Sequence, residues 1–127
     1  MNGLNIKAFF KILIIVFFIS TNANAEPRPW TKEEKILLFW SSMASVADMY
    51  TTCNALSDPD NWEINPMLGR HPGNGQVIIY MSFSQIVTVI IAHFWPDMRK
   101  RILTGKATIN TVFAIHNDNL IKTGRGF

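Results

Sequence analysis

Apolar and polar residues alternate along the chain in a pattern that predicts helices. An unbroken apolar run, ILIIVFFI, fills residues 12–19. Three longer stretches follow, at residues 32–56, 76–95 and 98–120, and each has the spacing or the length of a helix. We expect an all-α fold, a small three-helix membrane-associated bundle that follows an N-terminal signal peptide.

The first apolar run has the features of a secretory signal peptide. Lys7 and Lys11 precede or border it, no acid accompanies them, and small residues lead to A-N-A ending at Ala25. This order predicts a signal peptide at residues 1–25, cleaved after Ala25, and a helical domain at residues 26–127. The alternative is an uncleaved anchor, but the run is short for the ~20 apolar residues that a membrane span needs.

The stretch at residues 32–56 begins with a capping box, in which Thr31 is the N-cap and Glu34 reaches back to it. Its large apolar residues leave one side of the helix polar. That polar stripe consists of Ser41, Ser45, Asp48 and Thr52.

A long loop at residues 58–75 combines prolines and glycines with large apolar residues. We expect those apolar side chains to be buried between the first two helices and to anchor the loop. They are Trp62, Ile64, Met67 and Leu68. The anchored loop would bring Glu63 and Asn65 next to Asp48.

The stretch at residues 76–95 contains no Lys, Arg, Asp or Glu, and it is long enough to cross a bilayer. The alternative is the buried central helix of a soluble bundle. The last stretch, at residues 98–120, is mixed, and Gly105 suggests a division into a basic turn and a core helix at residues 108–120. We favour one span, at residues 76–95, with the other two helices packed against it or lying in the interface.

Each predicted helix carries a weakly polar stripe. The side to which these stripes face distinguishes a bundle in a membrane from one in water. In a membrane the stripes should face one another, because hydroxyl and imidazole groups avoid lipid. In water they would more often face the solvent.

The net charge of the domain at residues 26–127 is small. Without Lys7 and Lys11, ten Lys and Arg residues stand against nine Asp and Glu residues, a net charge of +1. The basic cluster lacks interleaved aromatic residues, so we expect no nucleic-acid partner. A role at a membrane surface or in setting membrane topology fits the cluster better. Its members are Arg99, Lys100, Arg101 and Lys106. The single cysteine, Cys53, cannot form an internal disulfide and is expected to be buried and inert.

Several polar residues could carry chemistry. Asp48, Glu63, His93 and His116 could converge on a metal ion or form a general acid–base pair. Alternatively, these four residues join Thr52, Asn65 and Asn117 in a structural hydrogen-bond network. No H-E-x-x-H or other standard metal spacing is present, so no cofactor is expected and the question of a metal stays open.

A family resemblance rests on short motifs. Asp48 with Thr52, the loop E-I-N-P-M-L-G-R-H-P at residues 63–72, and the late His116-Asn117 pair carry it, together with three single residues. The single residues are Tyr80, His93 and Arg99. The chain resembles a set of short exported proteins of Gram-negative bacteria and their phages that share an Asp, a Glu-x-Asn-Pro-x-Leu-Gly-x-His-Pro loop and a terminal His-Asn. Related short membrane proteins also carry Glu-x-Asn-Pro after an Asp-bearing helix.

The resemblance implies a fold and a cell-envelope location, at the inner membrane or in the periplasm, and no reaction. We expect a small exported, non-enzymatic envelope protein that contacts membrane lipid, other envelope proteins or itself. One alternative is a lysis or envelope-disrupting accessory protein of a phage or plasmid. Another is a small membrane enzyme or metal-binding protein that uses Asp48, Glu63, His93 and His116.

Overall fold

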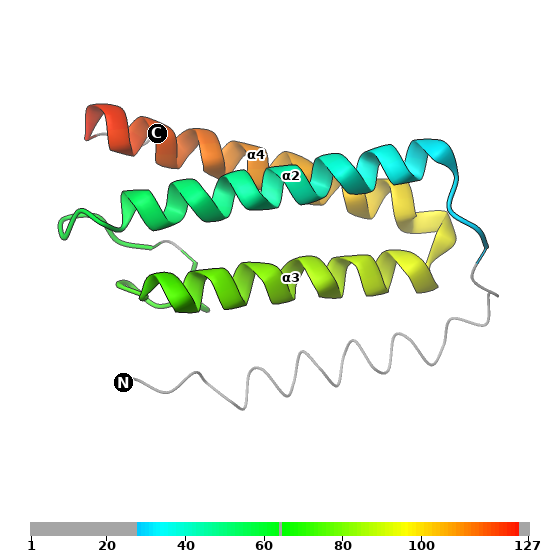
Figure 1. The fold of residues 1–127 in the computed structure, drawn as a ribbon, viewed down its shortest axis with the longest axis horizontal. Helices are drawn as coiled ribbons and strands as arrows, with labels where there is room; N and C mark the ends of the chain where they lie inside the picture. The colour runs from blue at the N-terminus through cyan, green and yellow to red at the C-terminus, as the bar shows by residue number, and fades with distance from the viewer. Residues whose placement is uncertain (1–27, 64, 125–127) are drawn as a thin grey trace.

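The computed structural model describes residues 28–63 and 65–124. In that part of the chain the elements are α2 (Lys32–Ala55), α3 (Asn74–Phe94), the short 3₁₀ helix η1 (Pro96–Met98) and α4 (Arg99–Thr123). The three long helices lie lengthwise beside one another, and no strand occurs among these residues (Figure 1). The all-helical three-helix prediction is confirmed. The signal peptide, its cleavage after Ala25 and the burial of Ile64 lie outside the described residues.

The bundle has two distinct ends. One end carries the long loop at residues 56–73, and we call it the loop end (Figure 1). The other carries the start of α2, the end of α3 and η1, and we call it the turn end. Because α3 runs antiparallel to α2 and α4 runs back again, residues distant in sequence meet at each end.

Local sequence sets the helix boundaries. The Thr31 Oγ1 atom accepts the Glu34 N–H at 3.2 Å, and the Glu34 carboxylate accepts the Thr31 N–H at 2.9 Å, so the predicted capping box is confirmed. Pro96 ends α3, because it cannot continue the backbone hydrogen-bond ladder.

Gly105 does not divide the last helix, so that prediction is wrong. The helix α4 is continuous from Arg99 to Thr123 and makes its most extensive contacts with α2. A mid-helix glycine costs about 1 kcal/mol relative to alanine. Packing along the length of α2 outweighs that small cost.

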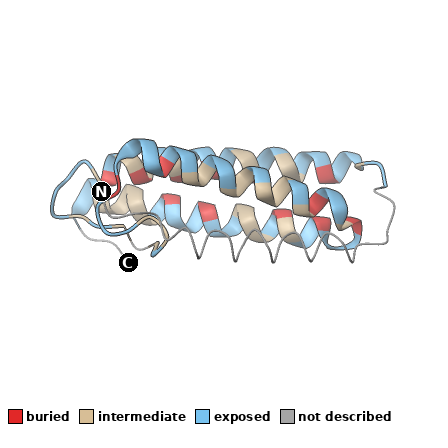
Figure 2. Ribbon diagram, turned by 90° about the horizontal axis from the view of Figure 1, so that it is seen from below, coloured by how far each residue is buried: buried red, intermediate tan, exposed pale blue. Residues whose placement is uncertain are grey.

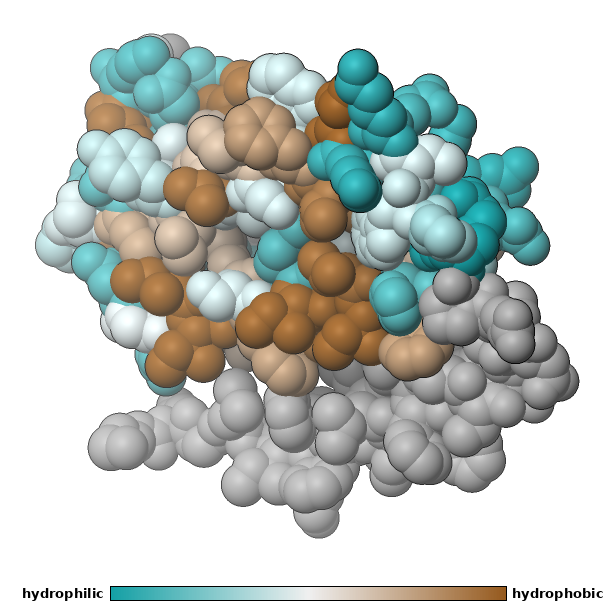
Figure 3. Space-filling view, turned by 45° about the vertical axis from the view of Figure 1, so that its right-hand side comes forward, coloured by the Kyte–Doolittle hydropathy of each residue, from teal (hydrophilic) through white to brown (hydrophobic). Residues whose placement is uncertain are grey.

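Burial in the bundle is inverted relative to a water-soluble protein. Five of the residues buried along its axis are polar, and the buried apolar residues are mostly small. These five are Ser41, Ser45, Asp48, Thr52 and Asn110. Large apolar side chains lie outside instead, with Trp40 61% and Ile79 72% exposed. Figure 2 shows how few positions on each helix are buried, and Figure 3 shows apolar side chains across the middle of one face.

The polar stripes of the three helices meet inside the bundle. Asn110 Nδ2 on α4 donates to Ser45 Oγ on α2 at 2.5 Å, and that hydroxyl donates to Gln85 Oε1 on α3 at 2.9 Å. Gln85 Nε2 donates in turn to Ser42 Oγ at 3.1 Å. Each helix therefore contributes a side chain to one hydrogen-bond network.

Within the described residues, α3 is the one helix long and apolar enough to cross a membrane by length and composition. Its mean hydropathy is 1.9 over the best window, and 11% of that window is buried in the bundle.

Candidate functional site

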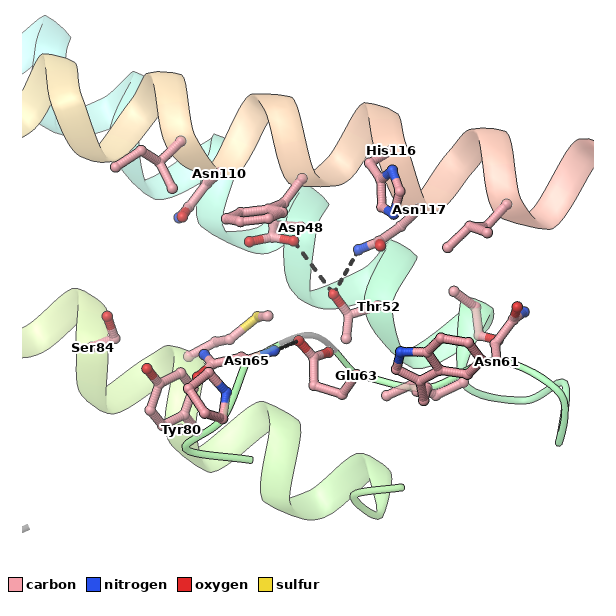
Figure 4. A pocket seen from close by; sticks show the side chains of 18 of the residues that line it. Asp48, Thr52, Asn61, Glu63, Asn65, Tyr80, Ser84, Asn110, His116 and Asn117 are labelled. Atoms are coloured by element: carbon pink, nitrogen blue, oxygen red, sulfur yellow. Dashed lines mark hydrogen bonds between the residues drawn. The ribbon is translucent and has the colours of Figure 1, made fainter. Parts of the chain in front are cut away.

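A cavity of about 400 Å³ lies between the three helices near the loop end, and the loop forms part of its wall (Figure 4). It lies beside the Ser45 network, since Asn110 takes part in both. Polar side chains from α2, α4 and the loop point into it, among aromatic and aliphatic ones.

The α2 wall of the cavity holds a buried carboxylate. Asp48 is 6% exposed, and its Oδ1 atom accepts the Thr52 hydroxyl at 3.3 Å. Thr52 Oγ1 also accepts Asn117 Nδ2 from α4 at 2.8 Å (Figure 4). Asp48, Thr52 and Asn117 thus form a hydrogen-bonded chain from one helix to the next.

The opposite wall carries a cation. Lys106 Nζ on α4 donates to Ser84 Oγ on α3 at 2.8 Å, and both side chains line the cavity. Tyr80 and His116 line it as well, and Figure 4 shows His116 on α4 above Asn117. The hydrogen bond of the Lys106 ammonium therefore joins α4 to α3 at the cavity.

The Glu-x-Asn-Pro motif in the loop is held by its own side chains. Glu63 Oε1 accepts the Asn65 N–H at 2.8 Å, and Asn65 Oδ1 accepts the Met67 N–H at 3.0 Å. The Glu63 N–H donates to the Arg70 carbonyl at 2.8 Å, which closes the loop. The motif fixes the loop path, and it places Glu63 and Asn65 in the cavity wall as expected.

Most of the predicted network residues meet in this cavity, and one does not. Its lining includes Asp48, Thr52, Glu63, Asn65, His116 and Asn117. His93 lies at the turn end instead, where its Nδ1 accepts the Trp30 indole N–H at 3.4 Å. The antiparallel register is the reason: Ser45 faces Gln85, so residue 93 lies beyond it toward the start of α2. The predicted convergence of His93 with Asp48 is therefore corrected.

The loop anchors are less buried than predicted. Trp62 is 65% exposed, although it borders the cavity, so its predicted burial is wrong. Met67 and Leu68 are half-buried, and so is Cys53. The hydrogen bonds of Glu63 and Asn65 help to hold the loop path that the apolar side chains were expected to anchor.

The basic cluster is not a continuous surface patch. Arg99 is fully buried at the turn end and donates to the Glu34 carboxylate at 3.0 Å. Its Nε also donates to the Ala92 carbonyl at 2.8 Å, and its guanidinium lies 4.2 Å from the centre of the Trp30 ring. Lys100 pairs with Glu33, whereas Lys106 lines the cavity.

The buried Glu34 carboxylate pairs with two arginines, whereas the sequence predicted only its role in the helix cap. Arg28 forms a second ion pair with it at 2.5 Å. The hydrogen bonds from Arg28 do most to lower the pKa of Glu34, from 4.5 to about 2; those from Thr31 and Arg99 add to them, while burial opposes. The available signal was Arg99, a cation three residues after the Pro96 break, since basic side chains there can cap the last carbonyls of a helix.

The donor set of the cavity limits its chemistry. Residues 28–63 and 65–124 contain no group of three or more His, Cys, Asp or Glu side chains placed to hold a metal ion. The cavity offers carboxylate, amide and hydroxyl groups beside an apolar wall. Such a lining can hold a small polar ligand or can serve as a structural network.

No family model, curated protein or solved structure matches this chain. The geometry of the bundle and its cavity therefore carries the functional argument.

Proposed function

We propose that this protein is a small exported cell-envelope protein whose helical bundle is embedded in a membrane and acts by contacts with lipid or protein partners. The observation that carries the proposal is the inverted burial of the bundle. Ser45, Asp48 and Asn110 are turned inward, while Trp40 and Ile86 are 61% and 56% exposed. In water this arrangement would leave apolar surface uncovered and would give up burial free energy of about 25 cal/mol per Å².

In lipid, unlike in water, burying large apolar side chains inside the bundle brings little gain. Acyl chains solvate large apolar side chains, so helices gain little by burying them against one another. Hydroxyl, amide and carboxylate groups then gain from meeting inside, where they satisfy each other's hydrogen bonds. The network of Asn110, Ser45 and Gln85 is an interior of this kind.

Helix length agrees with this environment. The helices α2, α3 and α4 have 24, 21 and 25 residues. At about 1.5 Å per residue each is about 31–38 Å long. The hydrocarbon core of a bilayer is about 30 Å thick, so each helix is long enough to cross it.

The charged residues support the same placement. In α2 the segment between Lys35 and Asp58 contains Asp48 as its one charged residue, and that carboxylate faces inward. In α4 the segment between Arg101 and Asp118 contains only Lys106, which faces the cavity. Charges thus gather at the turn end and at the loop end, with an apolar band between them. We place α3, Asn74–Phe94, as the membrane-spanning helix, with α2 and α4 packed against it.

Cysteine accessibility tests the proposal. Cys53→Ala provides a cysteine-free background, into which Ile86→Cys is introduced at the middle of α3 and Asp60→Cys in the exposed loop. In intact membranes a water-soluble maleimide should label the Asp60→Cys protein and leave the Ile86→Cys protein unlabelled. Both should react after the protein is unfolded.

Fractionation gives the matched measurement. The full chain should stay in the membrane pellet at alkaline pH, which strips peripheral proteins, and should enter solution with detergent. Equal labelling at both cysteine positions, together with release at alkaline pH, would refute membrane embedding.

A further inference from the structure

Two carboxylates share the cavity at the loop end, and neither forms an ion pair with a described residue. Asp48 on α2 and Glu63 in the loop both line it (Figure 4). The ion pairs formed in the described part of the chain involve the acids Glu33, Glu34 and Asp118 instead. Burying the Asp48 carboxylate outside an ion pair costs free energy. The negative charge of Glu63 repels that of Asp48 and adds to this cost.

The cation in the lining does not remove this cost. Lys106 acts electrostatically on Asp48, but its ammonium donates to Ser84 on α3 at 2.8 Å. Counted with His116 neutral, the charged side chains of the lining sum to −1. The cavity therefore favours a guest with one positive charge.

The rest of the lining indicates what kind of cation fits. A volume of about 400 Å³ lies in the range of small-molecule sites, roughly 300–1,000 Å³. Aromatic and aliphatic side chains cover much of the wall, so the guest needs an apolar body as well as a charge. They include Leu56, Trp62, Tyr80, Ile109, Phe113 and Leu120.

We propose that this cavity binds a primary ammonium group, which sits between the carboxylates of Asp48 and Glu63, while the carbon body of the ligand contacts the apolar wall. An ammonium suits this set of acceptors because its three N–H groups can donate to two carboxylates and one neutral oxygen. The Tyr80 oxygen or an amide oxygen of Asn117 would serve as that neutral acceptor. Aromatic rings in the wall add cation–π attraction.

The ammonium could belong to a free amine or to the ethanolamine headgroup of a lipid. The cavity lies at the loop end, where the proposed placement in the membrane brings the bundle to the headgroup level. The binding chemistry is the same in both cases. It does not depend on membrane embedding, because the carboxylates come from within the chain.

Calorimetric titration of the full chain in lipid-free detergent micelles tests the site. Phenethylamine is the probe, and 2-phenylethanol, which replaces the ammonium by a neutral hydroxyl, is its control. We expect saturable binding of the amine and at least tenfold weaker binding of the alcohol. Absence of saturable amine binding, or equal affinity for the two, would overturn the proposal, and neither result would affect the labelling test of membrane embedding.

Matched variants locate the binding. Asp48→Asn and Glu63→Gln each remove one negative charge and keep the shape, so each should weaken amine binding at least tenfold. Glu33→Gln changes an exposed carboxylate at the turn end and should leave binding unchanged. If Asp48→Asn loses helical circular dichroism, Glu63→Gln carries the test, since Glu63 lies in the loop. Unchanged affinity in the correctly folded carboxylate variants would overturn the assignment.

Lipid composition then separates the two sources. The same titration is run in nanodiscs of phosphatidylcholine and in nanodiscs that contain phosphatidylethanolamine. A headgroup that occupies the cavity should compete and lower the apparent affinity for phenethylamine several-fold. Equal affinity in the two nanodiscs supports the site with a free amine as its ligand.

Discussion

The guanidinium of Arg99 donates to the carboxylate of Glu34 at 3.0 Å, and both side chains are fully buried at the turn end of the bundle. This pair joins the first turn of α2 to the first turn of α4 across 65 residues of chain. Arg99 also donates to the carbonyls of Ala92 and His93, which end α3. One ion pair therefore fixes the positions of all three helices at this end.

Glu34→Gln should destabilise the bundle by about 3 kcal/mol, because it leaves Arg99 buried without a counter-charge. Unfolding of the purified chain, followed by circular dichroism as sodium dodecyl sulfate is added to mixed micelles, measures the change. Glu33→Gln is the matched control one residue earlier, since its pair with Lys100 is exposed and should contribute less than about 1 kcal/mol. Equal losses in the two variants would contradict the structural role assigned to the buried pair.

The same ion pair predicts that the stability of the bundle depends on pH. Glu34 lies at the turn end, outside the proposed membrane-spanning helix, and its pKa falls from 4.5 to about 2 on folding. The unfolded chain therefore binds the proton more tightly than the folded one. The stability that Glu34 contributes should be complete above pH 4.5 and should be lost as the pH falls toward about 2. The Glu34→Gln variant should show a flatter pH profile over this range, and a profile with the slope of the unsubstituted chain would exclude Glu34 as its source.

The helices were predictable from sequence because their signals are local. The Thr31–Glu34 capping box, the Pro96 break and the uncharged run at residues 76–95 each act within a few turns of chain. The predicted boundaries consequently lie close to the observed ones. The predicted break at Gly105 was wrong because the free-energy cost of a mid-helix glycine is small compared with the packing of α4 on α2. No local sequence pattern shows that packing.

The candidate site was predictable only in part, because its assembly depends on register. Asp48, Glu63 and His116 were expected together and do line one cavity. His93 shares their residue type but sits at the other end, since the antiparallel packing of α3 on α2 sets which residues face each other. The pairing of Arg99 with Glu34 was missed for the same reason, because the position of Arg99 after Pro96 does not show which residue of another helix it meets.

Asn110→Ala should test the polar interior. The change removes the amide that donates to Ser45 on α2, and interhelical hydrogen bonds in membranes are worth about 0.6 kcal/mol on average and up to about 1.7. We expect a loss of about 1 kcal/mol in the same unfolding assay. Thr108→Ala on the exposed side of α4 is the control and should cost no more than a few tenths of a kcal/mol. A larger loss from Thr108→Ala than from Asn110→Ala would show that the interior network does not stabilise the bundle.

The predicted signal peptide can be tested by mass. Cleavage after Ala25 is expected because A-N-A supplies the small side chains that such a site requires, and it would leave Glu26 as the N-terminal residue. Mass spectrometry of the chain purified from membranes should report residues 26–127. Recovery of the chain with Met1 still attached would show an uncleaved anchor.

Asn65→Ala should loosen the loop that covers the cavity. The Asn65 carboxamide oxygen accepts the Met67 N–H at 3.0 Å, so the side chain holds the turn that follows Glu63. The backbone N–H of Asn65 donates to Glu63, and this hydrogen bond is kept in the variant. Without the carboxamide the Met67 N–H loses its partner, and we expect a cost of about 1 kcal/mol, confined to the loop. Limited proteolysis should then cut between α2 and α3 several times faster, while the helical circular dichroism stays unchanged. His71→Ala, at an exposed position in the same loop, is the matched control and should leave the cutting rate unaltered. If both variants are cut at the rate of the unsubstituted chain, the Asn65 hydrogen bond does not hold the loop over the cavity.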